Sequence, residues 1–297
     1  MGKVRTLKNK PNKSGEERLD IRLVAMDLDG TLLDAHKHIS DENLRALRAC
    51  EARGIKMVFS SGRSFESLRG MALEAGLSSP IISSNGARVD LSPNGPMLID
   101  YPFDPALARR VYDIMLDSGI YFVVYNPGRL FKCNATAGGA NRGTNIASWN
   151  EKKEPSLVDV VDDPRLTISE GLKHVHKFVA FTEDTERLGA LKDRLSKETP
   201  TSLSSSWFDN VEVLRPGAGK GMAVKDLSKA LGIKKAQVMA FGDNLNDVDM
   251  LESVGVPVAM ENAIEPLKAI ARFVAPHHDA SGVGQMLRTL VLGGEGA

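Results

Sequence analysis

The chain has 297 residues, of which 42% are hydrophobic and 26% charged, as in a folded globular protein of about two domains. Its 38 basic residues balance its 38 acidic ones, which disfavours nucleic acid as a partner, and its two cysteines exclude a disulfide scaffold. No apolar run approaches the roughly 20 residues that cross a bilayer. We therefore expect a cytoplasmic protein with no membrane partner, while the oligomeric state stays open.

The first part of the chain alternates apolar runs with amphipathic segments. Residues 1–20 are polar and mixed in charge, and they predict a flexible N-terminal extension. Strands are then expected at 21–26, 55–59 and 80–82, and helices from Ser40 to about 53 and over 64–75. This β-α-β-α-β order predicts a parallel sheet covered by helices.

The middle of the chain has a different pattern. A helix is expected from its cap at Asp104 to 117 and another over 185–197, with strands at 97–101, 120–125, 129–133, 175–181, 201–206 and 211–214. This βαββ order, seen twice, predicts an antiparallel sheet with helices on one face. His174 and His176 alternate along one of these strands, and we interpret them as packing or surface residues.

The helix and strand alternation resumes after 212, with helices at 219–231, 246–254, 263–271 and 282–291 and strands at 238–241 and 256–259. The simplest interpretation is an α/β protein with a Rossmann-like parallel-sheet core, residues 21–87 and 212–292. An α+β domain, residues 88–211, interrupts this core. Proline and glycine residues mark both junctions.

Polar side chains follow three predicted core strands. Ligands of open parallel sheets bind outside the carboxyl ends of the strands, so these loops are expected to share one crevice. The polar residues are Asp27 and Asp29 after the first strand, Ser61 and Arg63, with Gly62 between them, after the second, and Asp243, Asn246 and Asp247 after the strand at 238–241.

Four carboxylates in a small space repel one another unless they are protonated or neutralised. Oxygen-only ligands favour Mg²⁺, and Lys220 offers a further counter-charge. Each residue alone has a simpler explanation: Asp-x-Asp-Gly is a common turn, Ser61 suits a helix cap, and Lys220 suits an exposed helix face. Their joint placement favours a metal-dependent site.

Four motifs together resemble the haloacid dehalogenase (HAD) superfamily, and most closely its Cof-type phosphatases. They are Asp27-Leu-Asp-Gly-Thr-Leu-Leu33, Ser61-Gly-Arg63, Lys220-Gly221 and Gly242-Asp-Asn-Leu-Asn-Asp247. The resemblance covers about residues 21–290, and the insert resembles the C2B cap of that family. Two departures are Ser61, where many relatives have Thr, and Glu261, which adds a negative charge near the predicted site.

The resemblance implies a role for each matching residue. Asp27 would be the nucleophile that forms an aspartyl-phosphate, and Asp29 the general acid and base. Mg²⁺ would be held by the Asp27 and Asp243 carboxylates and the Asp29 backbone carbonyl, with Asp247 in support, and Ser61, Gly62 and Lys220 would bind the phosphate. Supporting roles would fall to Asn246, Asn85 and Asn262.

The leading hypothesis is a Mg²⁺-dependent phosphatase acting on a small phosphorylated metabolite, such as a sugar phosphate. A phosphomutase of the phosphomannomutase type and a non-catalytic binding protein on the same fold are the alternatives. A basic loop at 128–142 is a candidate for substrate contact, although a solvated cap loop explains it equally well.

Overall fold

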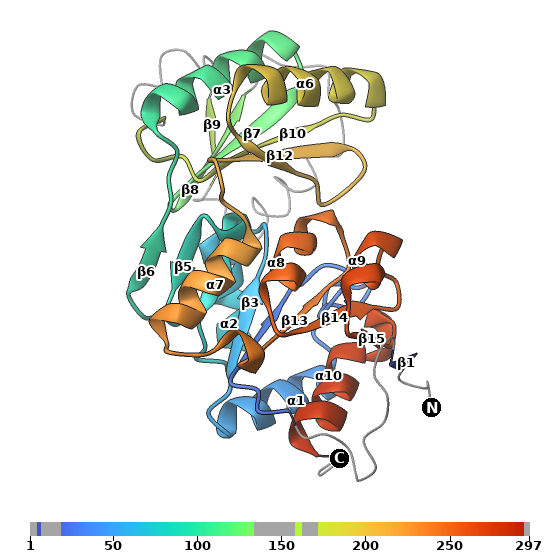
Figure 1. The fold of residues 1–297 in the computed structure, drawn as a ribbon. Helices are drawn as coiled ribbons and strands as arrows, with labels where there is room; N and C mark the ends of the chain where they lie inside the picture. Colours follow the sequence, from blue (N-terminus) through green and yellow to red (C-terminus); the bar gives the residue numbers. More distant parts are fainter. Residues whose placement is uncertain (1–4, 7–18, 134–157, 162–171, 294–297) are drawn as a thin grey trace. The chain divides into compact units, whose positions relative to one another are not determined.

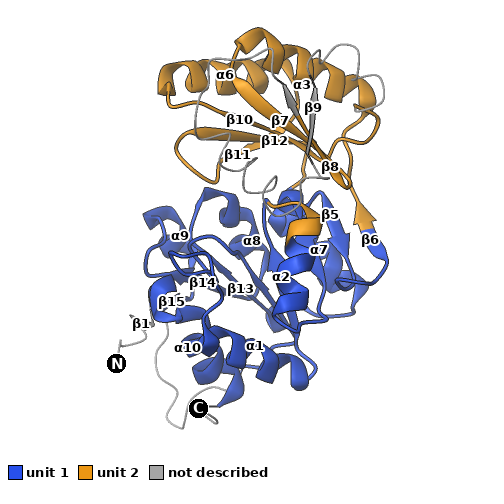
Figure 2. Cartoon of the chain, turned by 180° about the vertical axis from the view of Figure 1, so that it is seen from behind, with its two compact units in different colours: residues 1–62, 68–98, 219–297 blue, residues 63–67, 99–218 orange. Residues whose placement is uncertain are grey.

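A computed structural model describes residues 5–6, 19–133, 158–161 and 172–293. These residues form two sheets, one with nine strands and one with six (Figure 1). Two compact units contain them: unit 1 comprises residues 1–62, 68–98 and 219–297, and unit 2 comprises residues 63–67 and 99–218 (Figure 2). The α/β core and the α+β insert that the sequence predicts are therefore both present.

The nine-stranded sheet of unit 1 is parallel from β15 to β4, and its outer pairs β1–β15 and β4–β5 are antiparallel. Its strands β2 and β13 are buried at every residue, which indicates that both faces are covered. Across the sheet the strands are β1 (Arg5–Thr6), β15 (Phe273–Ala275), β14 (Val256–Met260), β13 (Val238–Gly242), β2 (Leu23–Met26), β3 (Lys56–Ser60), β4 (Ile81–Ser83), β5 (Arg88–Asp90) and β6 (Met97–Asp100).

Helices cover this sheet, with α1 packed on α10 and α7 packed on α8 (Figure 1). The Ser40 hydroxyl accepts a hydrogen bond from the Asn43 N–H at 3.2 Å, which confirms the predicted start of α1. The helices are α1 (Asp41–Ala52), α2 (Phe65–Glu74), α7 (Lys220–Ala230), α8 (Val248–Ser253), α9 (Glu265–Ile270) and α10 (Gly282–Leu287).

The six-stranded sheet of unit 2 is antiparallel except for the pair β8–β9. Alternate residues of β7 face two different hydrophobic clusters, and Phe122 and Val124 belong to the larger one, which α3 and α6 complete. In order the strands are β11 (Ser202–Ser204), β12 (Asn210–Leu214), β10 (Lys177–Phe181), β7 (Tyr121–Asn126), β8 (Arg129–Cys133) and β9 (Val158–Val161), and the helices are α3 (Pro105–Ser118) and α6 (Thr185–Glu198).

Several elements differ from the prediction. The strands β5, β9 and β15 were not predicted, because they are short and their apolar patterns are weak. The helix expected over 246–254 begins as a 3₁₀ turn at Leu245–Asp247, and the one expected over 282–291 ends as a π-helical turn at Arg288–Leu292. His174 lies in a 3₁₀ turn, Leu172–His174, rather than in the strand that follows.

The unit boundaries also differ from those expected at 88 and 211. Because β5 pairs with β4, the chain stays in unit 1 as far as Leu98. Because β12 pairs with β10, unit 2 extends to Ala218. Within the expected N-terminal extension, Arg5–Thr6 form β1, while residues 1–4 and 7–18 lie outside the described residues, as does most of the loop at 128–142.

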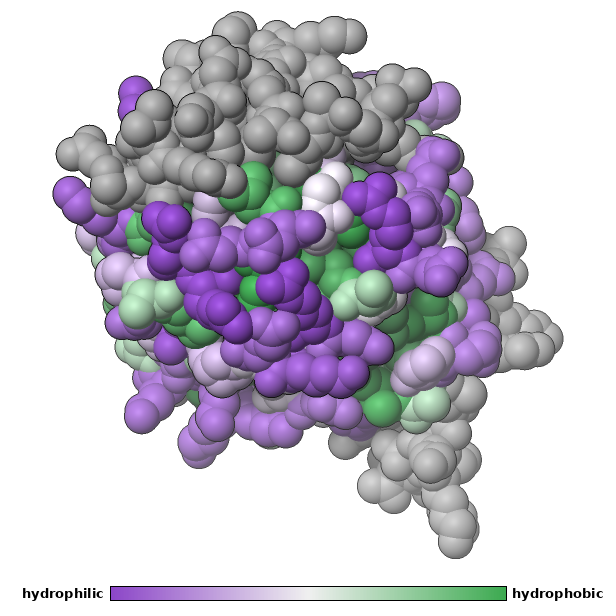
Figure 3. Space-filling view, turned by 90° about the horizontal axis from the view of Figure 1, so that it is seen from above, coloured by the Kyte–Doolittle hydropathy of each residue, from purple (hydrophilic) through white to green (hydrophobic). Residues whose placement is uncertain are grey.

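Few large hydrophobic side chains are exposed in the described part of the chain. Seen from above, the surface of the described residues has hydrophobic areas that alternate with hydrophilic ones (Figure 3). None of the described helices combines the length and apolar character that crossing a membrane requires. The exposed large hydrophobic residues are Leu73, Met97, Leu98, Trp207, Phe208 and Leu245.

Candidate active site

The candidate site lies in unit 1, at the carboxyl edge of three neighbouring parallel strands, β13, β2 and β3. Asp27 follows β2, and its N–H still donates to the Phe241 carbonyl of β13 at 3.1 Å. Ser61 follows β3, and its N–H donates to the Ile82 carbonyl of β4 at 3.0 Å. Strand pairing therefore fixes the backbone from which these side chains project, as the sequence predicts.

A buried ammonium group lies between two carboxylates at this edge. Lys220 is the first residue of α7, and its Nζ donates to Asp27 Oδ1 and to Asp247 Oδ1, both at 2.6 Å. The Lys220 and Asp247 side chains are fully buried, and that of Asp27 is 9% exposed. Bonds of this kind between full charges are among the strongest hydrogen bonds in proteins.

Asp247 also shapes the loop that carries Asp243. Its Oδ2 accepts hydrogen bonds from the Asp243 N–H at 3.0 Å and from the Asn244 N–H at 3.2 Å. The Thr31 hydroxyl donates to Asp243 Oδ1 at 2.9 Å, so the loops after β2 and β13 are joined directly. Carboxylate oxygens of Asp27, Asp243 and Asp247 all lie within 4.8 Å of one another, which is close enough for one cation.

The electrostatics of this cluster are dominated by burial and by an excess of carboxylates. Burial raises the pKa of Asp27 well above its usual value, although Lys220 opposes the effect. Burial, followed by repulsion from Asp247, raises the pKa of Asp243 to about 7. Burial alone would lower the pKa of Lys220, but the Asp247 and Asp27 carboxylates raise it above its usual value. The cluster therefore favours an additional positive charge.

Gly30 is required where the first loop passes Asp243. Its φ is +82°, in the region that favours glycine, and a Cβ at this position would overlap the Asp243 carboxylate. The glycine thus allows the Asp27–Thr31 loop to approach the Asp243 loop closely. The same approach places the Thr31 hydroxyl within hydrogen-bond distance of Asp243.

Asp29 is oriented differently from Asp27. Its side chain is 42% exposed, and its Oδ1 accepts a hydrogen bond from Lys37 Nζ at 2.8 Å. The structure therefore does not place the Asp29 carboxylate in the buried cluster. The resemblance gave Asp29 a metal contact through its backbone carbonyl, so the side-chain position leaves that expectation untested.

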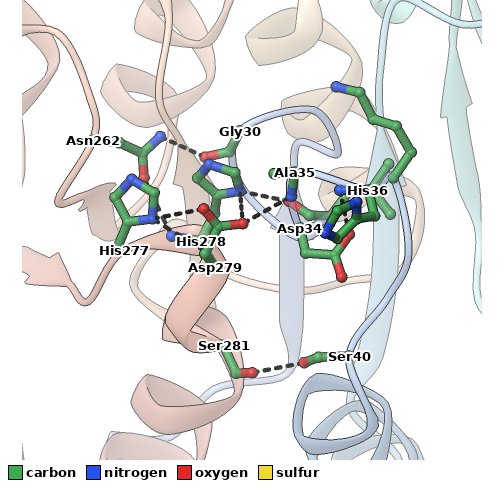
Figure 4. Close-up of polar contacts among 12 residues, drawn as sticks. Gly30, Asp34, Ala35, His36, Ser40, Asn262, His277, His278, Asp279 and Ser281 are labelled. Atoms are coloured by element: carbon green, nitrogen blue, oxygen red, sulfur yellow. Dashed lines mark hydrogen bonds and ion pairs between the residues drawn. The ribbon is translucent and has the colours of Figure 1, made fainter.

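The segment that follows the first motif is held by residues just before α10 (Figure 4). His278 Nδ1 donates to the Leu33 carbonyl at 2.8 Å, and the Ala35 N–H donates to Asp279 Oδ1 at 2.8 Å. The Ser40 and Ser281 hydroxyls are 2.7 Å apart. These contacts hold residues 33–40 next to the residues just before α10.

The remaining predicted residues contribute mainly through backbone contacts. Asn262 Nδ2 donates to the Gly30 carbonyl at 2.8 Å, and the Asn85 N–H donates to the Ser61 carbonyl at 3.0 Å. Gly62 follows Ser61, which is buried, and Asn246 lies in the 3₁₀ turn Leu245–Asp247. Glu261 is exposed, and its Oε2 accepts a hydrogen bond from the His277 N–H at 3.1 Å.

Sequence reasoning missed three contributors to this arrangement. Thr31 lies inside the first motif, two residues after Asp29, and its position beside a predicted acidic loop was a usable signal. His278 and Asp279 are more than 240 residues away in sequence from the segment they hold. His278 is half-buried and bonded to the Leu33 carbonyl. Only the folded chain brings these segments together.

Comparison with known proteins identifies the family of this chain. The profile of the haloacid dehalogenase-like hydrolases matches residues 24–287. The 5-amino-6-(5-phospho-D-ribitylamino)uracil phosphatase YwtE of Bacillus subtilis is 29% identical over 287 residues, covering 92% of this chain and 99% of its own. The HMP-PP phosphatase of Citrobacter koseri is 32% identical over 250 residues, covering 84% of this chain and 87% of its own.

A solved haloacid dehalogenase-like hydrolase from B. subtilis has the same fold, with a TM-score of 0.79 and 29% identity, covering 91% of this chain and all of its own. The chain belongs to the haloacid dehalogenase-like hydrolases. Within that superfamily it is a phosphatase, an enzyme of the phosphoric monoester hydrolase class.

Proposed function

We propose that this protein is a Mg²⁺-dependent phosphatase that hydrolyses a small phosphorylated metabolite through an aspartyl-phosphate on Asp27. The observation that carries the proposal is the buried cluster of Asp27, Asp247 and Lys220 at the carboxyl edge of the parallel sheet, with Asp243 beside it. This cluster has a nucleophile, a fixed cation and an excess of carboxylates, and hydrolysis by phosphoryl transfer needs all three.

The donor set suits Mg²⁺. Asp27, Asp243 and Asp247 offer only oxygen atoms, and burial followed by repulsion from Asp247 raises the pKa of Asp243, an effect that Lys220 opposes only in part. We assign these three carboxylates to the metal, together with the Asp29 backbone carbonyl that the family resemblance implies. A bound Mg²⁺ would reduce the repulsion between the Asp27 carboxylate and the substrate phosphate.

Asp27 and Asp29 have different roles in the two chemical steps. A carboxylate oxygen of Asp27 attacks phosphorus, and the bond to the leaving oxygen breaks. Asp29 gives its proton to that oxygen, and later takes a proton from the water that hydrolyses the aspartyl-phosphate. Because Asp29 pairs with Lys37 in this structure, that ion pair has to open before Asp29 can act.

Lys220, Ser61 and Gly62 are assigned to phosphate binding. The Lys220 ammonium stays protonated, because two carboxylates hold its pKa above the usual value. It can therefore orient Asp27 and offset the negative charge of the transferring group. Ser61 follows the adjacent strand, and the N–H of Gly62 offers a further donor next to it. Asn85 and Asn262 hold the backbone of these loops, and Asn246 belongs to the turn that carries Asp247.

We propose a sugar phosphate, or a similar small metabolite, as the substrate. Named relatives act on a phosphorylated ribityl compound and on HMP-PP, which are small phosphorylated molecules. The insert that forms unit 2 is a separate compact unit, and its side chains are the candidates for choosing among such substrates.

The experiment measures phosphate release from an aryl phosphate, with and without Mg²⁺, for the wild type and for Asp27→Asn. We expect Mg²⁺-dependent release by the wild type and a loss of at least about 10⁴-fold in Asp27→Asn, because the amide cannot attack phosphorus. A panel of sugar phosphates then identifies the preferred substrate by kcat/KM.

Asp193→Asn is the matched control, because Asp193 is an exposed carboxylate on α6 and undergoes the same chemical change. It should retain wild-type turnover. Turnover that survives in Asp27→Asn would refute the aspartyl-phosphate route. Transfer of the phosphate to another position of the substrate, rather than to water, would indicate a mutase instead.

A further inference from the structure

A second cluster of ionisable groups lies in unit 2, whereas the carboxylates of the candidate active site belong to unit 1. The carboxylate of Asp100, at the end of β6, contacts two imidazole rings. His174 Nε2 is 2.6 Å from Asp100 Oδ2, and His176 Nε2 is 2.7 Å from Asp100 Oδ1. Ligand atoms of all three residues lie within 4.8 Å of one another.

We propose that Asp100, His174 and His176 bind a divalent transition-metal ion, with Zn²⁺ as the best fit. Two imidazole nitrogens and one carboxylate oxygen form a donor set that Zn²⁺ accepts, usually with a fourth ligand from solvent or substrate. Imidazole is a poor ligand for Mg²⁺, so this site differs in metal preference from the oxygen-only cluster in unit 1.

The backbone around the three residues is held on both sides. The His176 N–H donates to the Tyr125 carbonyl at 2.8 Å, and the Phe103 N–H donates to the Val175 carbonyl at 2.8 Å. The first bond ties the start of β10 to β7, and the second ties the segment after Asp100 to the residue between the two histidines. The donor atoms are thus brought together by backbone pairing rather than by the ion pair alone.

The exposure of the three side chains suits a site that is built in the protein and open to solvent on one side. His176 is 2% exposed, Asp100 is 22% exposed, and His174 is 45% exposed. The buried histidine and the half-buried carboxylate form a fixed pair of ligands. The exposed histidine leaves a path by which the ion enters, and solvent can complete the coordination.

A second histidine pair shows why proximity of histidine and aspartate side chains is not enough to propose a metal site. His277, His278 and Asp279 also lie close together, but the His277 Nδ1 accepts a hydrogen bond from the Asp279 N–H at 3.2 Å. The His278 Nδ1 donates to the Leu33 carbonyl. The ring nitrogens that face Asp279 are therefore engaged by the backbone, whereas those of His174 and His176 point at the carboxylate itself.

A metal bound here would link the end of β6 to the start of β10. These segments are more than 70 residues apart in sequence, and the metal would connect the point where the chain enters unit 2 to the central part of its sheet. We therefore expect the ion to stabilise unit 2, because a ligand that binds the folded state raises its stability by an amount that grows with the logarithm of ligand concentration over Kd.

The test is Zn²⁺ binding to the full chain in millimolar Mg²⁺, which keeps the oxygen-only cluster occupied. After chelator treatment, Zn²⁺ is added, excess metal is removed by desalting, and retained zinc is measured by elemental analysis. We expect about one equivalent in the wild type and a rise in melting temperature of about 5 °C. Co²⁺ substitution should give visible absorption bands typical of nitrogen ligation.

His174→Ala should lower Zn²⁺ affinity by more than about 100-fold, because it removes a direct ligand. Its exposed position makes misfolding improbable, and circular dichroism checks the fold. His277→Ala is the matched control, with a similarly exposed side chain outside the cluster, and it should retain zinc. Asp100→Asn provides a second variant, with loss of zinc expected.

Two results would overturn the proposal. One is a wild type that retains no zinc under these conditions, which would leave an ordinary histidine–aspartate ion pair. The other is equal zinc retention by the wild type and His174→Ala, which would place the metal elsewhere. Phosphate release by Asp27 and its Mg²⁺ dependence are measured separately, so failure of this proposal leaves the proposed phosphatase mechanism intact.

Discussion

Among the described residues, each compact unit buries one lysine, and the two lysines have different surroundings. Lys220 in unit 1 is fully buried, with Asp27 and Asp247 both 2.6 Å from its ammonium. Lys177 in unit 2 is 2% exposed, with the Glu212 carboxylate at 3.5 Å and the centre of the Tyr125 ring at 4.5 Å. The two lysine side chains are thus almost equally buried, whereas the number of carboxylates close to each ammonium differs.

This difference distinguishes a lysine with a proposed catalytic role from a lysine that supports the fold. Around Lys220 there are more carboxylates than positive charges, and burial together with repulsion between the carboxylates raises the pKa of Asp27 and of Asp243. Around Lys177 a carboxylate and an aromatic face accompany the ammonium, between the adjacent strands β10 and β12 and beside β7. A buried lysine is therefore a weak functional signal by itself, and the excess of carboxylates is the stronger one.

The largest expected effect comes from removing the charge at Lys220. Lys220→Met keeps much of the side-chain volume but leaves Asp27 and Asp247 without their shared cation. We expect phosphatase turnover to fall by about 10³-fold, in the range seen when a group that stabilises the transition state is deleted. Steady-state kinetics with an aryl phosphate in saturating Mg²⁺ measures the change.

Lys220→Arg separates charge from geometry. A guanidinium is larger and planar, and Lys220 is fully buried between two carboxylates, so Arg should not restore activity. Near-normal turnover in Lys220→Arg would mean that any positive charge suffices. Near-normal turnover in Lys220→Met would remove the distinction between the two lysines.

A smaller effect, on stability rather than chemistry, is expected at Lys177. Lys177→Met leaves the buried Glu212 carboxylate without this ammonium, which should lower the free energy of unfolding by roughly 3 kcal/mol. Denaturant unfolding monitored by circular dichroism measures the loss. The double variant Lys177→Met/Glu212→Leu should recover most of it, because both charges of this buried pair are then removed.

The double-mutant cycle decides whether this lysine is structural. A double variant as unstable as Lys177→Met would indicate that the lysine stem, rather than its charge, supports the sheet. At protein concentrations where the variant is folded, Mg²⁺-dependent turnover should change much less than in Lys220→Met. Equal losses of turnover would make Lys177 part of the chemistry and break the comparison.

Local patterns predicted most of the fold, and pairing between distant segments accounts for the rest. The caps at Ser40 and Asp104 and the apolar runs of β2, β3 and β13 carry their signals within a few residues. By contrast, β5 has three residues, two of them charged, and it is a strand because β4 lies beside it. The expected boundaries of the insert shifted for the same reason.

The candidate site shows the same division. Asp27 and Asp243 were predictable because parallel strands bring their carboxyl ends to one edge, and Lys220 because it begins a helix after a glycine-containing turn. The ion pair between Asp29 and Lys37 was not predictable, because the positive φ of 66° at Lys37 arises in the folded loop. Contacts of His278 and Asp279 depend on tertiary packing in the same way.

The smallest expected effect on the free energy of unfolding is at the ion pair between Lys37 and Asp29. This pair tests whether burial determines how much an ion pair contributes to stability. Its two side chains are 53% and 42% exposed, so water screens the charges, and Lys37→Met should change the free energy of unfolding by no more than about 1 kcal/mol. Denaturant unfolding at low and high salt measures this, and the difference between Lys37→Met and the wild type should shrink as salt rises. Methionine keeps the side-chain length and, like lysine, has a Cβ, so backbone strain at this position is matched. A loss as large as that of Lys177→Met would show that burial does not set the energetic scale of these lysines, because an exposed ion pair would then equal a buried one.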